Sequence, residues 1–188
     1  LIFIHMRLCL VGDKCGKTSI VQRWISPRKP IKNENTIGID MKTLMMKLDL
    51  KVVRVQLWDC SGEKYYQNLL DTYIDNSDMV VVVFDLTRTE SFERAKRWIE
   101  RIQGMHTKIT ACIIGNKLDL ESKRAVREKT IKRFVRQLNI KNVFYNECSA
   151  YTGENCRETL HMIVREGIRT DKVYTVEDFK PETSCRIV

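Results

Sequence analysis

The sequence has few of the features that mark membrane-spanning, zinc-binding or disulfide-linked proteins. Its longest apolar run in mid-chain is Met79–Phe84, far short of the roughly 20 residues that a membrane span requires. The seven cysteines are odd in number and scattered, without a C-x-x-C pair or a Cys/His spacing that fits zinc. We therefore expect reduced thiols and a cytoplasmic protein. The opening LIFIHMRLCLV lacks a signal-peptide cleavage site and predicts a strand.

A surplus of acidic residues is also missing. Thirty-three Lys and Arg against 24 Asp and Glu give a net charge of +9, which favours phosphates, anionic membranes or acidic proteins as partners. The densest basic stretch, 123–141, places Ile131, Phe134, Val135 and Leu138 at helical spacing. This pattern is more typical of a solvated helix than of a nucleic-acid patch, so no nucleic-acid partner is expected.

Length and hydrophobic content predict one domain of ordinary size. A chain of 188 residues, 43% of them hydrophobic, can bury a core of its own but is too short for a second large domain. Strand-like and helical segments alternate, which predicts the α/β class, with a mostly parallel sheet and helices on both faces. Strands are expected at 1–11, 38–50, 51–59, 79–85, 109–115 and 143–148, and helices at 17–25, 92–102 and 153–167. The domain is expected to span 1–169, followed by a mobile tail at 170–188.

The first candidate site follows the first strand, where ligands of such sheets bind. The segment reads Gly12-Asp13-Lys14-Cys15-Gly16-Lys17-Thr18-Ser19. Phosphates need converging backbone N–H groups, a helix N-terminus, a lysine and a hydroxyl for Mg²⁺, and the segment offers all four, as a P-loop does. It is one residue shorter than the usual pattern G-x-x-x-x-G-K-[ST]. The alternative interpretation is a plain glycine turn before a helix.

Three further segments follow later strands. Asp59-Cys60-Ser61-Gly62-Glu63 offers a carboxylate for Mg²⁺ through water and a glycine N–H for a terminal phosphate, although alone it also fits an ordinary turn. In Asn116-Lys117-Leu118-Asp119, a carboxylate can accept two hydrogen bonds from guanine, a donor pair that adenine lacks. Cys148-Ser149-Ala150 would present a backbone N–H to the guanine O6. Four such segments in this order predict a guanine-nucleotide site.

With these segments the chain resembles the small GTPases of the Ras superfamily over about residues 6–168, and looks most like a Rab. Thr36 lies in Thr36-Ile37-Gly38-Ile39-Asp40, which resembles a Rab switch I, and its separations from Lys17 and Asp59 match the family. Other positions that resemble Rabs are Trp58, Tyr73, Phe92 and Trp98. The resemblance implies the fold of a P-loop GTPase (G domain), with a central six-stranded, mostly parallel sheet, and a switch operated by GTP and GDP.

The resemblance also implies a role for each matching residue. Thr18 and Thr36 would ligate Mg²⁺ together with Asp59, Lys17 would bridge the β and γ phosphates, and Gly62 would sense the γ-phosphate. The guanine site would consist of Asn116, Lys117, Asp119, Ser149, Ala150 and Tyr151. The catalytic set for hydrolysis of GTP to GDP would be Glu63, Lys17 and Thr36. Met41, Trp58 and Tyr73 lie where Rabs meet effectors, with simple packing as the alternative for the two aromatic residues.

Partners and location follow from the same resemblance. A Rab-like switch is expected to be a monomer that meets effectors, an exchange factor and a GTPase-activating protein through its switch regions. Cys185 is fourth from the end of the sequence, a position that can be prenylated, although Arg186 and Val188 are atypical there. A single lipid would hold the protein reversibly on the cytosolic face of an endomembrane.

Several residues depart from the Rab pattern. Asp13 is ordinary when aligned from Gly12, but counted back from Lys17 it falls beside the γ-phosphate, which its charge would repel. The shortened loop also removes one N–H donor, and Lys14 is expected to compensate in part with its positive charge. Cys15 begins a helix amid positive charge, which predicts either a thiol of lowered pKa or an inert turn residue.

Glu63 and Tyr151 replace two functional residues of the family. Glu63 occupies the position of the catalytic glutamine, and a carboxylate only accepts hydrogen bonds, which predicts slow hydrolysis without a partner. Tyr151 replaces a lysine whose stem covers the base, and its ring is expected to stack there instead.

Three functional hypotheses remain at this point. The leading one is a guanine-nucleotide switch of membrane traffic with slow, partner-assisted turnover. The second is a binding module fixed in one state, either permanently loaded with GTP or empty because the phosphate loop fails. A small-molecule kinase on the same fold is disfavoured, because nothing between Lys17 and Asp59 resembles an arginine-rich lid.

Overall fold

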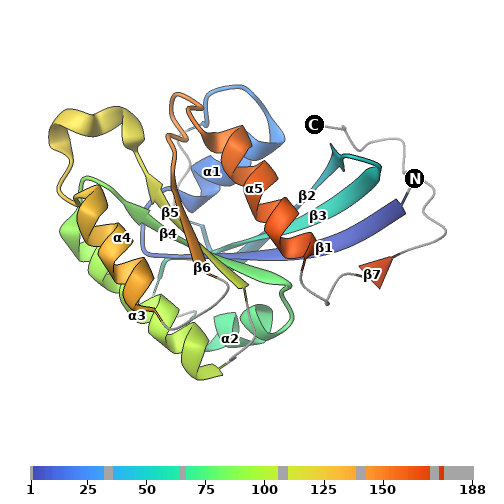
Figure 1. Ribbon diagram of the computed structural model, residues 1–188, viewed down its shortest axis with the longest axis horizontal. Coiled ribbons are helices and arrows are strands. Elements are labelled where there is room, and N and C mark those ends of the chain that lie inside the picture. The colour runs from blue at the N-terminus through green and yellow to red at the C-terminus, as the bar shows by residue number, and fades with distance from the viewer. Residues whose placement is uncertain are drawn as a thin grey trace.

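The computed structural model describes residues 2–31, 36–63, 67–105, 110–138, 143–169 and 174–175. Strands and helices alternate along the chain (Figure 1). The strands are β1 (Ile2–Val11), β2 (Ile39–Leu48), β3 (Lys51–Cys60), β4 (Met79–Asp85), β5 (Thr110–Asn116), β6 (Val143–Glu147) and β7 (Tyr174–Thr175). The helices are α1 (Lys17–Ile25), α2 (Gln67–Asp75), α3 (Thr89–Met105), α4 (Glu128–Gln137) and α5 (Cys156–Ile168), with a 3-10 helix, η2 (Leu118–Lys123), after β5. The predicted α/β class is confirmed.

Six of the strands form the predicted sheet, in the order β2-β3-β1-β4-β5-β6. Neighbouring strands from β3 to β6 are parallel, whereas β2 runs antiparallel to β3 as the predicted hairpin. Consecutive parallel strands need a crossover on a face of the sheet, and the helices supply those crossovers. The sheet therefore has the mostly parallel, six-stranded architecture that the sequence predicts.

A seventh strand lies within the segment expected to be a tail. β7 pairs antiparallel with β1, with Tyr174 opposite His5 and Thr175 opposite Ile4. β4 begins its pairing with β1 only at Leu8. The first residues of β1 thus have an edge that β4 leaves open, and β7 pairs with that edge.

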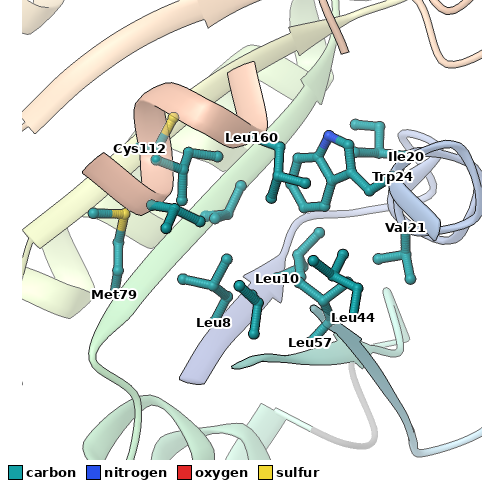
Figure 2. Packing of buried hydrophobic residues seen from close by; sticks show 14 of the residues in the cluster. Leu8, Leu10, Ile20, Val21, Trp24, Leu44, Leu57, Met79, Cys112 and Leu160 are labelled. Atoms are coloured by element: carbon teal, nitrogen blue, oxygen red, sulfur yellow. The ribbon is translucent and has the colours of Figure 1, made fainter. Parts of the chain in front are cut away.

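Two helical layers enclose the sheet. In Figure 1, α1 and α5 lie on one side, and α2, α3 and α4 lie on the other. Figure 2 shows Ile20 and Trp24 of α1 beside Leu160 of α5, with Leu8 and Leu10 of β1 below them. A second core on the opposite face contains Ile74 of α2, Phe92 and Ile99 of α3 and Ile131 of α4.

The central strands and the amphipathic helices explain these layers. Every residue of β4 and of β5 is buried, as expected for strands covered on both faces. The predicted stripe Phe92, Ala95, Ile99 and Ile102 is the buried face of α3. In the basic stretch, Ile131 is buried and Phe134 and Val135 pack against the same core, so α4 is the amphipathic helix that the spacing predicts.

Among the described residues, no helix has both the length and the apolar character to span a membrane. Cys185, with the rest of the sequence after Thr175, lies outside the described residues.

Candidate nucleotide-binding site

The predicted site segments meet at one edge of the sheet. The phosphate loop follows β1, the Asp59 segment ends β3, the Asn116 segment ends β5, and the Ser149 segment follows β6. All four strands are parallel, so their carboxyl ends lie at the same edge, where open α/β sheets bind ligands. Hydrogen bonds between these segments join them into one site.

Two positions of the phosphate loop require glycine, because the backbone there has a positive φ and because neighbouring atoms leave no space for a Cβ. Gly12 has φ +138° and Gly16 has φ +89°, both in a region that L side chains rarely adopt. A Cβ on Gly12 would lie 2.2 Å from the Val83 carbonyl oxygen, and one on Gly16 would lie 2.6 Å from Nδ2 of Asn116. The loop therefore packs tightly on β4 and on the guanine-site segment although it is one residue short.

Lys17 and Thr18 begin α1 beneath this loop. Lys17 is buried, and its Nζ donates a hydrogen bond to the Gly12 carbonyl oxygen. The first N–H groups of a helix have no partner within the helix, so the start of α1 can bind an anion. Ser19 lies half-buried in the same first turn. The arrangement provides a buried positive charge and free N–H groups where the sequence predicts phosphates.

Cys15 is a fully buried residue of the loop, and the hypothesis of a lowered thiol pKa is wrong. Its side chain has no exposed area, and its Sγ donates to the Val83 carbonyl oxygen at 3.0 Å. Burial raises the pKa of the Cys15 thiol, against the opposing charge of Lys17. The other described cysteines are likewise free and buried: Cys9, Cys60, Cys112, Cys148 and Cys156.

The three predicted magnesium ligands lie together. The Thr18 hydroxyl donates to Oδ2 of Asp59 at 2.5 Å and lies 2.8 Å from the Thr36 hydroxyl oxygen. Asp59 is 1% exposed, and its Oδ1 is buried without a hydrogen-bond partner among the described residues. Burial raises the pKa of Asp59, although the Thr18 hydrogen bond and the Lys17 charge act in the opposite direction. A divalent cation fits this set, because hard oxygen ligands suit Mg²⁺ and its charge would offset the buried carboxylate.

Asn116 connects the phosphate loop to the guanine-site segments. Its Nδ2 donates to the Cys15 carbonyl oxygen at 2.9 Å, and its Oδ1 accepts from the Ala150 N–H at 3.1 Å. The side chain is 2% exposed, so both bonds lie away from solvent. In this conformation the Ala150 N–H, one of the backbone donors of the segment predicted to face the guanine O6, is bonded to Asn116.

Asp119 is fixed by the last of the four segments. The Ser149 hydroxyl donates to Oδ1 of Asp119, and the Thr152 N–H donates to that same hydroxyl at 3.0 Å. The other carboxylate oxygen of Asp119, Oδ2, takes no part in the bond with Ser149. The geometry is compatible with a carboxylate that accepts hydrogen bonds from a base.

Asp85, at the end of β4, is a site residue that the sequence analysis missed. It is fully buried, and its Oδ2 lies 2.6 Å from Nζ of Lys117. Its Oδ1 accepts from the Thr87 N–H at 2.9 Å and from the Thr87 hydroxyl at 2.7 Å. Burial opposes ionisation, but the bonds from Lys117 and Thr87 outweigh it and hold the pKa of Asp85 below its usual value. The signal was present, since the strand MVVVVFD ends in a carboxylate, and β3 likewise has Asp59 next to its last residue.

A second missed group surrounds Tyr151. Arg23 of α1 donates through Nε to the Ala150 carbonyl oxygen at 2.9 Å and through Nη2 to the Tyr151 carbonyl oxygen. Lys29 Nζ lies 4.5 Å from the centroid of the Tyr151 ring and 3.4 Å from its hydroxyl oxygen. Tyr151 is 58% exposed. Arg23 fixes the backbone of this segment, and Lys29 lies over one face of the ring.

Ion pairs hold both sides of the phosphate loop. Nζ of Lys14 lies 3.4 Å from Oε1 of Glu63, and Nη1 of Arg94 donates to Oδ2 of Asp13 at 3.1 Å. A Cβ on Gly62 would lie 2.8 Å from the backbone nitrogen of Lys14, so the loop lies directly against Gly62. Lys14, whose charge was expected beside the phosphates, is paired with Glu63 in this conformation.

The predicted effector surface divides into buried and exposed residues. Trp58 is 7% exposed and packs edge-on against Tyr73, with 5.1 Å between ring centroids. Met41 is 57% exposed, and Ile37, which was not among the residues predicted for this surface, is 84% exposed. Packing accounts for the position of Trp58, whereas Met41 and Ile37 offer apolar contact area to solvent.

Comparison with known proteins agrees with this geometry. The Ras family model matches residues 7–169. The chain is 32% identical over 174 residues to GTP-binding protein ypt5 of Schizosaccharomyces pombe, covering 90% of this chain and 81% of that protein. It is 30% identical over 162 residues to Ras-related protein RABA4c of Arabidopsis thaliana, covering 85% and 71%.

A human relative is much longer than this chain. EF-hand calcium-binding domain-containing protein 4B is 29% identical over 187 residues, which are 95% of this chain but 25% of that protein. The chain thus spans a quarter of the length of that relative, and the similarity says nothing of the other three quarters. The extent of the family match and the identity to the yeast and plant proteins lead to one conclusion: this chain belongs to the Ras family of small GTPases and is Rab-like.

Proposed function

We propose that the chain is a Rab-like GTP/GDP switch in membrane traffic whose own hydrolysis of GTP is slow. The observation that carries the proposal is the contact of Thr36 with Thr18, which in turn is bonded to Asp59. This contact joins the segment after residue 35 to the phosphate loop and to the end of β3. A ligand that binds these oxygens would order the Thr36 segment, and its loss would release it.

The residues that would hold the nucleotide form three groups. The loop 12–16 and the start of α1 would bind the phosphates, with Lys17 as the buried positive charge. Thr18, Thr36 and Asp59 would bind Mg²⁺, which when bound neutralises phosphate charge. Asp119 would accept hydrogen bonds from guanine. Asn116 holds the phosphate loop to the Ala150 segment, and the ring of Tyr151 would cover the base.

Slow unassisted hydrolysis is supported by the chemistry and the contacts of Glu63. A carboxylate accepts hydrogen bonds from an attacking water but cannot donate one to the phosphate, as an amide does. Lys14 lies 3.4 Å from the Glu63 carboxylate and competes with water for it. The proposed catalytic set of Glu63, Lys17 and Thr36 therefore depends on a partner for fast turnover.

A second candidate is a binding module fixed in one nucleotide state. The observation that favours it is the close approach of Gly62 to the loop, where a Cβ would lie 2.8 Å from the Lys14 nitrogen and 3.3 Å from Cα of Asp13. A γ-phosphate at Gly62 has to share this space with the shortened loop. The protein would then prefer GDP over GTP and would not switch between the two states.

Location and partners belong to the proposal as well. The Rab and Ypt relatives support a role in membrane traffic. We place effectors, an exchange factor and a GTPase-activating protein at the switch regions, where Met41 and Ile37 are exposed. Prenylation of Cys185 would hold a monomeric chain on the cytosolic face of an endomembrane, and the intact mass of protein from a eukaryotic host tests the lipid.

Nucleotide analysis tests the proposed switch. The purified protein is denatured, and the released nucleotide is identified by ion-exchange chromatography, with Mg²⁺ present throughout or removed by EDTA. We expect guanine nucleotide that is retained with Mg²⁺ and lost without it, and exchange of GDP for GTP on incubation. Protein that carries only one of the two nucleotides and refuses the other would establish the fixed module. A chain that binds neither GDP nor GTP at millimolar concentration contradicts both candidates and would instead indicate the module that is empty because its phosphate loop fails.

A further inference from the structure

Asp13 is the one acidic residue of the phosphate loop, and a helix outside the nucleotide motifs supplies its partner. Oδ2 of Asp13 accepts a hydrogen bond from Nη1 of Arg94 at 3.1 Å. Arg94 lies in α3, 81 residues away in the sequence. The side chain of Asp13 is 11% exposed, whereas that of Arg94 is 45% exposed.

The position of Asp13 makes its charge important for a phosphate ligand. Its Cα lies against Gly62, since a Cβ on Gly62 would approach it to 3.3 Å. Gly62 is the residue that, under the proposed function, meets the third phosphate. An unpaired carboxylate on a residue that adjoins Gly62 would repel GTP more than GDP, because GTP carries the extra negative charge there.

Arg94 removes this repulsion in two ways. It brings a positive charge within hydrogen-bond distance of the carboxylate, and it holds the carboxylate toward α3. A pair of this kind has little value for stability when one partner is nearly half exposed. Its value for binding is larger if the third phosphate binds at Gly62, because the backbone of Asp13 lies against that residue.

We propose that Arg94 is a positioning residue that determines nucleotide specificity: by pairing with Asp13 it lets the shortened, acidic phosphate loop accept the third phosphate of GTP. The inference rests on the proposed function, and it assigns to α3 a part in the choice between GTP and GDP. In this proposal Arg94 acts through Asp13, the residue with which its guanidinium pairs.

The test compares the dissociation constants of GTP and GDP in full-length variants. Fluorescent, non-hydrolysable GTP and fluorescent GDP are titrated with Mg²⁺ onto the wild type, Arg94→Ala, Asp13→Asn and the double variant. We expect Arg94→Ala to weaken the binding of GTP relative to that of GDP by on the order of tenfold at low salt, and this difference in affinity to shrink as the salt concentration rises. Asp13→Asn, which loses the charge but keeps the shape, should bind GTP as well as the wild type does or better. The double variant should recover the wild-type ratio.

Controls separate this effect from loss of folding and from simple anchoring of the loop. Arg97→Ala removes another exposed arginine of α3 and should leave the ratio unchanged, while Arg94→Lys retains the charge and should stay close to the wild type. If the pair only anchors the loop, Asp13→Asn will weaken GTP binding as Arg94→Ala does, and the double variant will not recover the wild-type ratio of GTP to GDP affinity. That result overturns the inference. An unchanged ratio in Arg94→Ala overturns it as well while leaving the proposed function intact. A wild type that binds neither nucleotide overturns both.

Discussion

Asn116 offers the sharpest test of how the site is assembled, because it can be measured without any nucleotide. Replacing it with alanine removes the acceptor of the Ala150 N–H and the donor to the Cys15 carbonyl oxygen, at 3.1 Å and 2.9 Å. The side chain is 2% exposed, so two buried backbone groups lose their partners. An unsatisfied buried group costs about 1–3 kcal/mol, and water entering the vacated space reduces that cost, so we expect Asn116→Ala to lower the free energy of unfolding by about 2–4 kcal/mol.

Urea unfolding of the nucleotide-free, magnesium-free protein measures this loss. Asn146→Ala is the matched control, because Asn146 is half-buried and its Nδ2 makes one bond of 2.7 Å, to the Thr159 hydroxyl. The loss of that bond should cost about 1 kcal/mol. If Asn116→Ala destabilises the protein no more than Asn146→Ala does, Asn116 does not hold the two loops together and the proposed assembly of the site is refuted.

The remaining predictions concern hydrolysis, the metal ligand and the base. Glu63→Gln should raise the single-turnover rate of unassisted GTP hydrolysis by about tenfold, because the amide also donates a hydrogen bond; an unchanged rate of phosphate release would mean that Glu63 takes no part. The folded-state pKa of Asp59 is raised, so without Mg²⁺ its contribution to stability is present below the unfolded value near 3.8 and is lost as pH rises through the folded pKa. Urea unfolding at a series of pH values should therefore show that the free energy of unfolding of Asp59→Asn rises relative to that of the wild type toward neutral pH. Magnesium should stabilise only the wild type. If the free energies of the two proteins change with pH in parallel, the argument from burial is contradicted. Tyr151→Ala should weaken GDP binding by about fivefold through loss of ring contact, and Tyr151→Lys should restore most of it; titration of fluorescent GDP that finds equal affinity in Tyr151→Ala would exclude stacking on the base.

The fold and the motif residues could be predicted because their signals are local. β4 and β5 are short apolar runs that end in polar residues, and a parallel sheet brings such ends to one edge. The glycine positions of the loop follow from their motif spacing, and the structure gives both a positive φ. Strand ends and motif spacing therefore suffice to predict that Thr18, Asp59 and Asn116 lie at the same edge of the sheet.

The residues that were missed act across long separations in the chain. Arg23 reaches the carbonyl oxygens of Ala150 and Tyr151 from α1, and Arg94 reaches Asp13 from α3. Each is an ordinary arginine on an amphipathic helix, and only tertiary packing shows which carbonyl or carboxylate it faces. Lys29 is similar, since it gains its role only by lying over Tyr151.

Cys15 shows where a local rule fails. A cysteine at the start of a helix beside lysines predicts a lowered thiol pKa, but this side chain lies inward against β4. Desolvation then outweighs the nearby charge and raises the pKa instead. The direction of the side chain decided the outcome, and spacing does not specify that direction.

The burial of the cysteines gives the protein a built-in reporter. Because the six described thiols are enclosed, a maleimide can reach them only when the domain opens, so the rate of their alkylation measures opening rather than surface chemistry. A guanine nucleotide that closes the domain should slow that labelling in proportion to its occupancy. Mass spectrometry of labelled peptides would then show which part of the sheet opens first.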